Sequence, residues 1–515
     1  MSLRTANGRL AHDSPDIYPL MPFLRHQNGR PVEAEFPMET AANLWDASHY
    51  EVARSVLSRG VALVYLIAFL NVRNQFRPLV GERGLLPLPE FLARHTFAAA
   101  PSLFHWRHSD RLVGAVAWTG MVMATGIVLG VADAAPLWVG PLWWLGMWGL
   151  YLSIVNVGQV FYGFGWESLL LEAGFYAAFL GNDTVAPPLL TILCFRWLLF
   201  RVEFGAGMIK LRGDRCWRAL TCLDYHHETQ PMPGPTSRWF HRLARPLHRV
   251  EVAANHFAQL AAPFGLFLPQ PFAGAAAAVM IVTQGYLMVS GNYAWLNLVT
   301  LLIGFSAVPD SWFAVVGLRP APTSSDSPIW FVVVVAVMTL LVLWLSRHPV
   351  RNLLGRGQLM NFSFNRYHIV NAYGAFGSVT RRRRELIIEG TTEAAPGETA
   401  WRAYEFKGKP GDVRRRPPQW APYHLRLDWL MWFVPLSPSY ASGWLDRFVE
   451  HLLTADPATL ALLKHDPFDG EPPLLVRGRY VDYRFATPDE KRATGAWWTA
   501  GASTPAFAPT ALSPP

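Results

Sequence analysis

Cysteine and charge are both scarce in this sequence. Its 515 residues include three cysteines, Cys194, Cys216 and Cys222, which are too few to form the disulfide framework of a small secreted protein. Charged residues make up 16% of the chain, whereas soluble domains typically contain about 25%. Together with a hydrophobic content of 51%, these proportions argue against an ordinary soluble domain and favour a membrane part joined to a polar part.

Several sequence motifs of enzymes and metal sites are absent as well. The chain has no G-x-S-x-G, no Walker loop, no H-E-x-x-H and no C-x-x-C. Asp224, His226, His227 and Glu228 cluster in one segment, but they lack the i, i+4 spacing of a helical zinc site. We interpret the cluster as a polar turn and predict neither a metal site nor a cofactor.

Long hydrophobic runs fill residues 49–346. A helix needs about 20 residues to cross the hydrocarbon core of a bilayer, and nine segments approach that length. They are 53–72, 112–132, 136–160, 165–181, 186–207, 251–270, 271–290, 292–309 and 329–345. No N-terminal signal peptide is recognisable, so we expect the first segment to direct insertion. The sequence therefore predicts a polytopic α-helical membrane protein with about nine spans.

Polar segments flank and interrupt this helical domain. Residues 1–48 form a polar N-terminal segment, and residues 211–248 form a long polar loop after the fifth predicted span. Over 347–500, short runs of aromatic and β-branched residues alternate with Gly/Pro turns, which predicts a β-rich extramembrane domain. Residues 501–515 are rich in Ala, Pro, Ser and Thr and are predicted to be a disordered tail.

The C-terminal domain contains recognisable candidate elements. We predict strands at 384–389, 401–406 and 480–485 and one or two amphipathic helices over 444–463. The four arginines at 381–384 are interpreted as a solvated or membrane-facing basic patch rather than a specific anion site.

The charge balance and the span count bear on partners and topology. The net charge of +8 is compatible with nucleic acid or with anionic lipid, but a basic domain beside many spans favours lipid. We therefore predict the membrane as a partner and no nucleic acid. Five predicted spans precede the polar loop and nine precede the C-terminal domain. Both numbers are odd, so both parts should lie on one face of the membrane, opposite the N-terminus.

Ionisable residues inside predicted spans mark the candidate site, because a charge in lipid is costly unless it is paired or faces a cavity. Arg196, Glu203 and Lys210 are seven residues apart, so a helix places them along one stripe. Carboxylates on the preceding span are candidate counter-charges. The predicted polar set is Glu167, Glu172, Arg196, Arg201, Glu203 and Lys210.

Two interpretations of this set stay open. One is a buried ion-pair network that holds the helices together, and the other is a polar cavity that binds a substrate or transfers protons. Gly205 and Gly207 would let another backbone approach this helix closely. Cys216 and Cys222 could form a disulfide or remain two buried thiols.

The segment from residue 196 to 231 resembles the lipase maturation factor family. The family pattern is an apolar span ending in F-R-x-x-F-G-x-G-x-x-K-L, followed by G-D-x-x-W-x-x-L-T and Y-H-Y-E-T-Q-P. The matching residues are Phe200, Arg201, Phe204, Gly205, Gly207, Lys210, Leu211, Gly213, Asp214, Trp217, Leu220, Thr221, Tyr225, His226, Glu228, Thr229, Gln230 and Pro231. Two residues depart from it: His227 replaces an aromatic residue, and Glu203 replaces an apolar one.

Further motifs extend the resemblance over about residues 50–498. The run GNYAWLNLVT, with Asn292, Tyr293 and Asn297, is similar to a family motif that opens a span. The segment 364–390 resembles N-x-Y-x-x-V-N-x-Y-G-x-F followed by an I-E-G strand. The segment 401–433 resembles W-x-x-Y-E-F-K-x-K-P-G-D followed by P-R-L-D-W-x-M-W-F.

The resemblance implies a function that composition does not. Animal members of the family are folding factors of the endoplasmic reticulum membrane that bring homodimeric lipases to an active state, and their C-terminal domain contacts the client. This chain is thus expected to be a membrane-bound maturation factor, not an enzyme, for a secreted lipase or another exported protein. Candidate client contacts are Arg426, Asp428, Trp429 and Trp432, although the run 429–433 could instead be a packed strand or a membrane-resting edge.

Two further expectations follow from the resemblance and the composition. The Arg-, Ala- and Pro-rich chain lacks a C-terminal retention signal, which suggests a bacterial member in a plasma membrane. The family also distantly resembles the membrane half of vitamin K-dependent carboxylases, where a lysine that ends an equivalent span acts as a base. Lys210 corresponds to that lysine, so the alternative function is an integral membrane enzyme of the carboxylase or quinone-epoxidase type. Glu203, one heptad away, would oppose this role by favouring the ammonium form.

Overall fold

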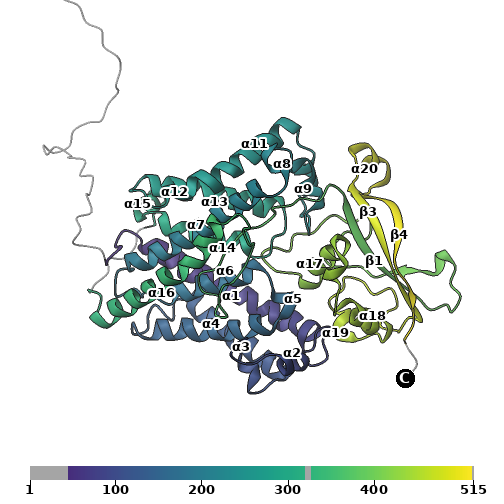
Figure 1. The fold of residues 1–515 in the computed structure, drawn as a ribbon, viewed down its shortest axis with the longest axis horizontal. Coiled ribbons are helices and arrows are strands. Elements are labelled where there is room, and N and C mark those ends of the chain that lie inside the picture. Colours follow the sequence, from purple (N-terminus) through teal and green to yellow (C-terminus); the bar gives the residue numbers. More distant parts are fainter. Residues whose placement is uncertain (1–44, 319–325, 513–515) are drawn as a thin grey trace, which may run out of the picture. The chain divides into compact units, whose positions relative to one another are not determined.

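The computed structural model describes residues 45–318 and 326–512 (Figure 1). Nearly all of the polar N-terminal segment predicted over 1–48 lies outside the described residues. The described residues belong to one unit, Leu44–Pro515.

Helices fill the chain up to residue 354 (Figure 1). The π-helical segment Phe257–Ala261 joins two of them. In chain order they are α1 (Glu51–Val80), α2 (Leu88–Arg94), α3 (Asp110–Val128), α4 (Val139–Val157), α5 (Gln159–Tyr162), α6 (Gly165–Ala177), α7 (Leu189–Arg212), α8 (Arg215–Arg218), α9 (Leu223–Thr229), α10 (Ser237–His241), α11 (Arg245–His256), α12 (Ala262–Gly265), α13 (Phe272–Ser290), α14 (Leu296–Gly304), α15 (Asp310–Ala314) and α16 (Ile329–Leu354).

Four helices of the described chain are long and apolar enough to cross a membrane by length and composition: α1, α3, α13 and α16. Each of the other five predicted spans contains helix, but the count of nine is not confirmed. Some of these helices are short, since α6 has 13 residues and α14 has nine. The 24-residue α7 is long enough, but it carries several buried charged residues, among them Arg196, Arg201 and Glu203.

The helical part packs around α1. This helix contacts α3, α6 and α14, and its side chains Leu57, Val61, Phe69 and Phe76 are fully buried. Burying apolar side chains of this size gives about 1.5–3 kcal/mol each. The α1 helix therefore belongs to the core of the domain and is not a separate anchor.

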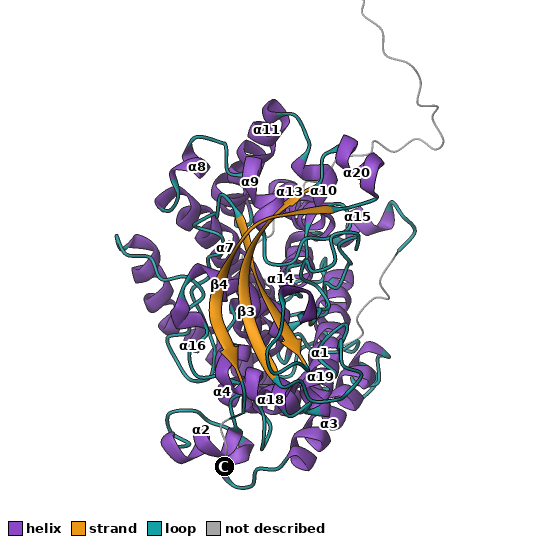
Figure 2. Ribbon diagram, turned by 90° about the vertical axis from the view of Figure 1, so that its right-hand side faces the viewer, coloured by secondary structure: helices purple, strands orange, loops and turns teal. Residues whose placement is uncertain are grey.

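A four-stranded antiparallel sheet forms the centre of the C-terminal part (Figure 2). Its order is β2 (Arg402–Ala403), β1 (Arg383–Thr391), β3 (Leu475–Phe485) and β4 (Trp498–Thr510). In the register of β1 and β3, Leu386 lies opposite Tyr480. The helices of this part are α17 (Arg426–Phe433), α18 (Leu445–Leu453), α19 (Pro457–Leu460) and α20 (Pro488–Thr494).

The amphipathic prediction for 444–463 corresponds to two helices. On α18, Phe448, Val449, Leu452 and Leu453 are buried, at the spacing of one helix face. The strands predicted at 384–389 and 480–485 lie within β1 and β3.

Two local predictions are wrong, and a third is confirmed only in part. Residues 501–510 belong to strand β4 and are not a disordered tail, because they pair along β3 and Phe507 packs against Gly478. Residues 401–406 form the two-residue strand β2 and an isolated β-bridge between Glu405 and His465, so the strand predicted there is confirmed only in part. The run 429–433 lies in helix α17 rather than in a strand or a membrane-resting edge.

Candidate functional site

The polar loop is held against the C-terminal sheet by one buried arginine. Arg383 on β1 is 1% exposed. It donates hydrogen bonds to the carbonyl oxygens of Glu228, Gln230 and Pro231, at 2.9 Å to Glu228 and 3.1 Å to Pro231. Hydrogen bonds from a charged donor are roughly twice as strong as neutral ones. The H-x-E-T-Q-P motif of the loop therefore joins two parts of the molecule.

The four-arginine run at 381–384 is not a uniform solvated patch, so that interpretation is wrong for Arg383. Along a strand, alternate side chains face opposite sides, and this places Arg383 inside. There it forms an ion pair with Glu385, and the same carboxylate forms a second ion pair with Lys409 at 3.0 Å. Arg384 points outward and contacts Asp482 at 3.1 Å.

His226, Tyr293 and Gln230 form a buried chain of hydrogen bonds. His226 Nε2 lies 3.0 Å from Tyr293 Oη, and that hydroxyl donates to Gln230. Gln230 in turn donates to Ser290 O at 3.1 Å at the end of α13. Burial lowers the pKa of His226 to about 3, so the ring is neutral at physiological pH. These hydrogen bonds join the H-x-E-T-Q-P motif of the loop to the G-N-Y motif that contains Asn292 and Tyr293.

Asn292, in the G-N-Y motif, connects the polar loop to the C-terminal part. Its amide nitrogen donates to Pro233 O at 3.3 Å and Pro418 O at 2.9 Å. Its amide oxygen accepts from the backbone N–H groups of Trp420 and Ala421 at 2.7 and 2.8 Å. All four hydrogen bonds of this 1% exposed side chain are made with backbone, so its role is to position segments.

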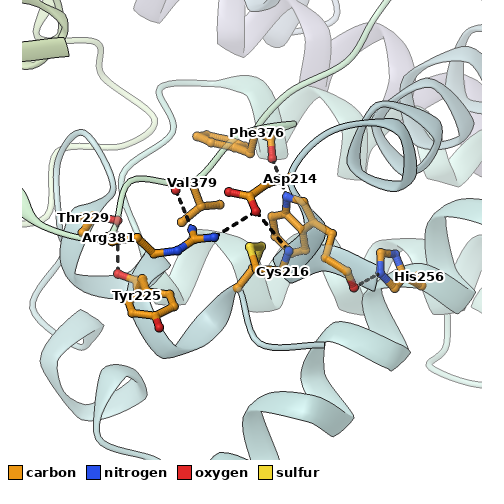
Figure 3. Close-up of a disulfide and its surroundings, with 10 residues drawn as sticks. Asp214, Cys216, Tyr225, Thr229, His256, Phe376, Val379 and Arg381 are labelled. Carbon is orange, nitrogen blue, oxygen red and sulfur yellow. Dashed lines mark hydrogen bonds and ion pairs between the residues drawn. A yellow bond between two sulfur atoms is a disulfide. The ribbon is translucent and has the colours of Figure 1, made fainter. Parts of the chain in front are cut away.

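The start of the loop is closed by a disulfide between Cys216 and Cys222 (Figure 3). This settles the choice left open by the sequence. Asp214 accepts from Cys216 N at 3.0 Å and from Arg381 Nη2 at 2.9 Å. The hydrogen bond from Arg381 holds the pKa of Asp214 below its ordinary value.

Aromatic residues of the loop complete this corner. Trp217 Nε1 donates to Phe376 O at 2.8 Å. The Arg381 guanidinium lies 4.8 Å from the centre of the Tyr225 ring. Glu228 accepts from Phe485 N at 2.7 Å, at the end of β3. The predicted loop residues are therefore together in space, and they contact the C-terminal part.

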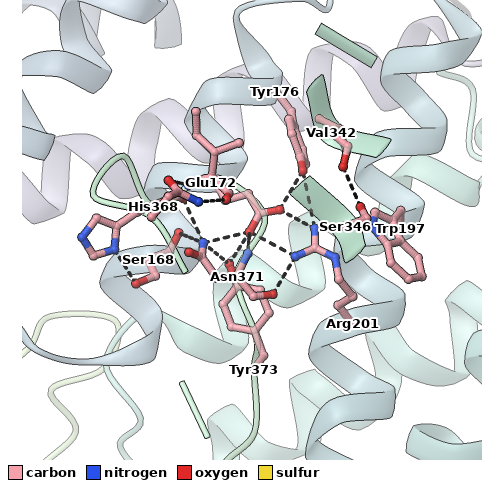
Figure 4. A network of polar contacts seen from close by, with 12 residues as sticks. Ser168, Glu172, Tyr176, Trp197, Arg201, Val342, Ser346, His368, Asn371 and Tyr373 are labelled. Atoms are coloured by element: carbon pink, nitrogen blue, oxygen red, sulfur yellow. Dashed lines mark hydrogen bonds and ion pairs between the residues drawn. The ribbon is translucent and has the colours of Figure 1, made fainter. Parts of the chain in front are cut away.

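Glu172 and Arg201 form a fully buried ion pair between α6 and α7 (Figure 4). Arg201 also donates to Asn371 O at 2.8 Å. Glu172 accepts from Tyr373 Oη at 2.7 Å and from the backbone N–H of Asn371 at 3.0 Å. Glu172 is a predicted counter-charge for α7, and its pairing with Arg201 agrees with the interpretation of a buried ion-pair network.

A close backbone approach completes this network. A side chain at Gly205 would strike the carbonyl of Tyr373, so this glycine lets the 371–374 segment lie directly against α7. The N-A-Y-G motif thus supplies Asn371 and Tyr373 to the ion pair. Sequence reasoning did not assign these two residues to the site.

Glu167 pairs with Arg426 rather than with a residue of α7. The Arg426 Nη1 atom lies 2.7 Å from Glu167 Oε1, and Tyr151 donates to the same carboxylate. Arg426 also donates to Asn71 Oδ1 at 2.7 Å and covers the Tyr162 ring at 3.5 Å. The R-L-D-W segment is therefore not a surface contact, because its arginine is a buried joint between the two parts.

The predicted client contacts need correction for the same reason. Arg426 is 0%, Asp428 1% and Trp429 2% exposed, so none of them can touch a client in this structure. Asp428 accepts from the backbone N–H of Gly408, and burial raises its pKa to about 6. Trp432 is half-buried and donates to Thr229 O at 3.0 Å, which again joins the C-terminal part to the loop.

The three charged residues of the predicted stripe on α7 have two separate sets of contacts. Arg196 donates to the carbonyls of Ser306 and Leu266 at 3.1 and 3.3 Å. Further along, Glu203 accepts from Gln284 at 2.7 Å and Gln259 at 3.2 Å. The three charges share one helix, but Arg196 belongs to a different set of contacts.

Lys210 belongs to the same set of contacts as Glu203. Its ammonium donates to Asn255 Oδ1 and Gln259 Oε1, both at 2.8 Å, and lies 5.0 Å from the centre of the Trp217 ring. Gln259 therefore bridges Lys210 and Glu203 without a direct ion pair between them. This arrangement differs from the tight pair of Glu172 and Arg201.

A cavity of about 620 Å³ lies beside this bridge. Glu203, Lys210 and Asn297 line it, together with residues of the loop and of α17. The α7 end of the stripe therefore borders a cavity, and substrate binding or proton transfer there stays a prediction. Within residues 45–318 and 326–512, no group of three or more His, Cys, Asp or Glu side chains is arranged to hold a metal ion.

Comparison with known proteins gives a consistent result. The family model described as "Lipase maturation factor transmembrane domain" matches residues 52–315, and "Lipase maturation factor C-terminal domain" matches 369–507. Lipase maturation factor 1 of Bos taurus is 39% identical over 90% of both chains. Lipase maturation factor 1 of Homo sapiens is 38% identical over 91% of this chain and 89% of its own.

More distant relatives are similar over most of the chain too. Lipase maturation factor 2 of Homo sapiens is 27% identical over 86% of this chain and 80% of its own. No solved structure matches the chain. These relatives are animal proteins, so they give no support to a bacterial origin or to a bacterial plasma membrane, and nothing found supports the carboxylase alternative. The chain belongs to the lipase maturation factor family.

Proposed function

We propose that this chain is a membrane-bound maturation factor whose clients are secreted lipases. The observation that carries the proposal is the match of both family domains, in order, in one chain. Relatives with the printed name Lipase maturation factor 1 are similar over about nine-tenths of their length. The folding role therefore rests on the whole architecture rather than on one motif.

The disulfide indicates on which side of the membrane the polar loop and the C-terminal part lie. Disulfides persist in oxidising compartments and are rare in the cytosol, so the loop that holds Cys216–Cys222 belongs on the exported side of the membrane. The C-terminal part contacts this loop through Arg383 and Trp432 and belongs on the same side. In an animal cell this is the lumen of the endoplasmic reticulum, where secreted lipases fold.

This placement agrees with nine spans. Besides α1, α3, α13 and α16, the segments that contain α4, α6, α7, α11–α12 and α14 would then cross the membrane. The 13-residue α6 and the nine-residue α14 would do so together with the residues that flank them. Glycosylation acceptors inserted at residue 395 and at residue 134 test the topology. We expect modification at residue 395 only, and an unmodified acceptor there would contradict the proposal.

The client surface must lie on exposed residues of the loop and the C-terminal part. Trp239 on α10 is 62% exposed and Tyr440 is 46% exposed. Large aromatic side chains of this kind are enriched at protein–protein contacts. We propose these two residues in place of the buried R-L-D-W segment as client contacts.

Secreted lipase activity tests the function directly. A homodimeric lipase is expressed in cells that lack an endogenous maturation factor, with and without this chain, and activity is divided by the amount of secreted lipase. We expect the specific activity to rise only when the chain is present. A secreted enzyme of another class serves as a control, and unchanged lipase activity would overturn the proposal.

A further inference from the structure

The cavity beside Lys210 contains hydrogen-bonding atoms that the protein does not use. Among the described residues, the Asn297 amide nitrogen and the Gln284 amide oxygen have no hydrogen-bond partner. Both side chains are 4% exposed and both line the cavity. A buried polar atom without a partner costs about 1–3 kcal/mol, so a ligand that satisfies these two atoms would gain from binding.

Three charged residues line the cavity: Lys210, Glu203 and Glu251, whose carboxylate lies 3.8 Å from His227 Nε2. Lys210 is held by two amide oxygens, and Glu203 is held by the amide nitrogens of Gln259 and Gln284. The cation and the anion thus offset one another across Gln259. Among the atoms that stay free are a donor on Asn297 and an acceptor on Gln284, and His227, Glu251, Tyr286 and Trp429 contribute further buried atoms without a hydrogen-bond partner. An uncharged hydroxyl group both accepts and donates, so it complements the Asn297 donor and the Gln284 acceptor.

The mouth of the cavity indicates where a ligand would enter. Val282, Met360 and Leu436 line the cavity and are 71%, 51% and 43% exposed. Val282 lies on α13, which is a candidate span, so its exposed face is turned to lipid. Asn361 and Ser378 also line the cavity and are exposed, so its opening is polar on that side and water can enter. On the α13 side, by Val282, a molecule dissolved in the bilayer would reach the cavity.

Size and lining restrict the ligand further. A volume of about 620 Å³ falls in the usual range of 300–1,000 Å³ for small-molecule sites and is too small for a two-chain phospholipid. Leu287, Leu296 and Val252 are part of the apolar lining. We propose that this cavity binds an uncharged single-chain lipid, whose hydroxyl head bonds to Gln284 and Asn297 and whose chain lies against the apolar lining.

Binding of monooleoylglycerol to the purified full-length protein in detergent tests the proposal. The assay is saturation with radiolabelled lipid, so it is independent of any lipase client. We expect saturable binding, and oleic acid should compete poorly because its carboxylate would have to be desolvated next to Glu203. Absence of saturable binding, or tighter binding of oleic acid, would overturn the uncharged-head assignment.

Two variants locate the site. Ala206 lines the cavity, so Ala206→Phe should fill it and abolish binding, whereas Ala275→Phe on the exposed side of α13 should not. Asn297→Leu removes one hydrogen bond to the head and should weaken binding about fivefold to tenfold. Gel filtration and thermal unfolding confirm that each variant is folded. Normal lipid binding by a folded Ala206→Phe variant would contradict the proposed site.

Discussion

Two groups of buried charges in this molecule are built differently. Glu172 pairs directly with Arg201, and Glu167 pairs directly with Arg426. Glu203 and Lys210 are instead separated by Gln259 and face a cavity. The directly paired groups are surrounded by further hydrogen-bond donors, which is what a structural joint requires. The bridged group leaves space and free polar atoms, which is what a binding site requires.

The largest effect is expected at the Glu167–Arg426 pair. Arg426→Met leaves a buried carboxylate unpaired, and breaking such a pair costs about 3–5 kcal/mol. We expect little folded protein, measured as the monodisperse fraction after detergent extraction. Arg73→Met on the exposed side of α1 is the control and should extract normally. A well-folded Arg426→Met variant would remove the distinction between the two groups.

The disulfide should have the next largest effect. Cys216→Ser opens a short loop whose closure is worth about 2–3 kcal/mol in the chain-entropy description. We expect lower resistance of the loop to proteolysis and a lower unfolding temperature. Cys194 is a buried free cysteine, so Cys194→Ser is the matched control. Equal losses in the two variants would show that the disulfide adds nothing beyond packing.

Acidification should weaken the joint between the loop and the C-terminal part. Burial lowers the pKa of His226 to about 3 and that of His241 to about 4, so the unfolded chain binds protons that the folded chain does not. The stability that depends on their neutral form is complete above pH 6.5 and falls as pH drops toward these values. We expect a net loss of about 2 kcal/mol between pH 7 and pH 5.

An opposing group limits this loss. The pKa of Asp428 is raised to about 6 by burial, so the folded state takes up one proton below that pH and is stabilised relative to the unfolded chain. The measurement is chemical denaturation of the purified protein at several pH values. A His226→Phe variant should lose less stability on acidification, and an identical pH dependence would contradict the assignment.

The smallest effect is expected at Lys210. Lys210→Met removes two hydrogen bonds, but the cavity lets water reach the amides of Asn255 and Gln259 that lose their partner. We expect a loss of about 1 kcal/mol in the free energy of unfolding. Arg201→Met is the comparison and should be much more destabilising, because Glu172 would be left without its ion pair. Equal losses in the free energy of unfolding at Lys210 and Arg201 would contradict the distinction between bridged and directly paired charges.

The sequence was informative about periodic and compositional features. Hydrophobic runs located the long helices of residues 49–346, except that α11 begins within the segment predicted as a polar loop. Short runs of aromatic and β-branched residues between Gly/Pro turns located β1 and β3. The seven-residue spacing correctly placed Arg196, Glu203 and Lys210 on one helix. Family motifs in the loop and after residue 290 proved to be contacts between segments far apart in the chain, as Arg383 and Asn292 show.

What could not be predicted depends on tertiary partners. The 501–510 segment looks disordered by composition, but β3 offers it an edge to pair with. Arg383 looks like part of a basic surface until β1 turns it inward toward the loop carbonyls. Arg426 and Trp429 look like an exposed recognition motif, yet Glu167 and the surrounding aromatic rings bury them. In each case the deciding residue lies more than 20 positions away in sequence.

Lipase activity with adjacent arginine variants tests the central claim that the loop and the C-terminal part act as one unit. Arg383 is buried in the joint, whereas Arg382 beside it is exposed. Each is changed to Met, and the specific activity of a co-expressed secreted lipase is measured in cells that lack a maturation factor. We predict that Arg383→Met lowers it to the level found without the chain, while Arg382→Met leaves it unchanged. Full lipase activity with Arg383→Met would contradict this account.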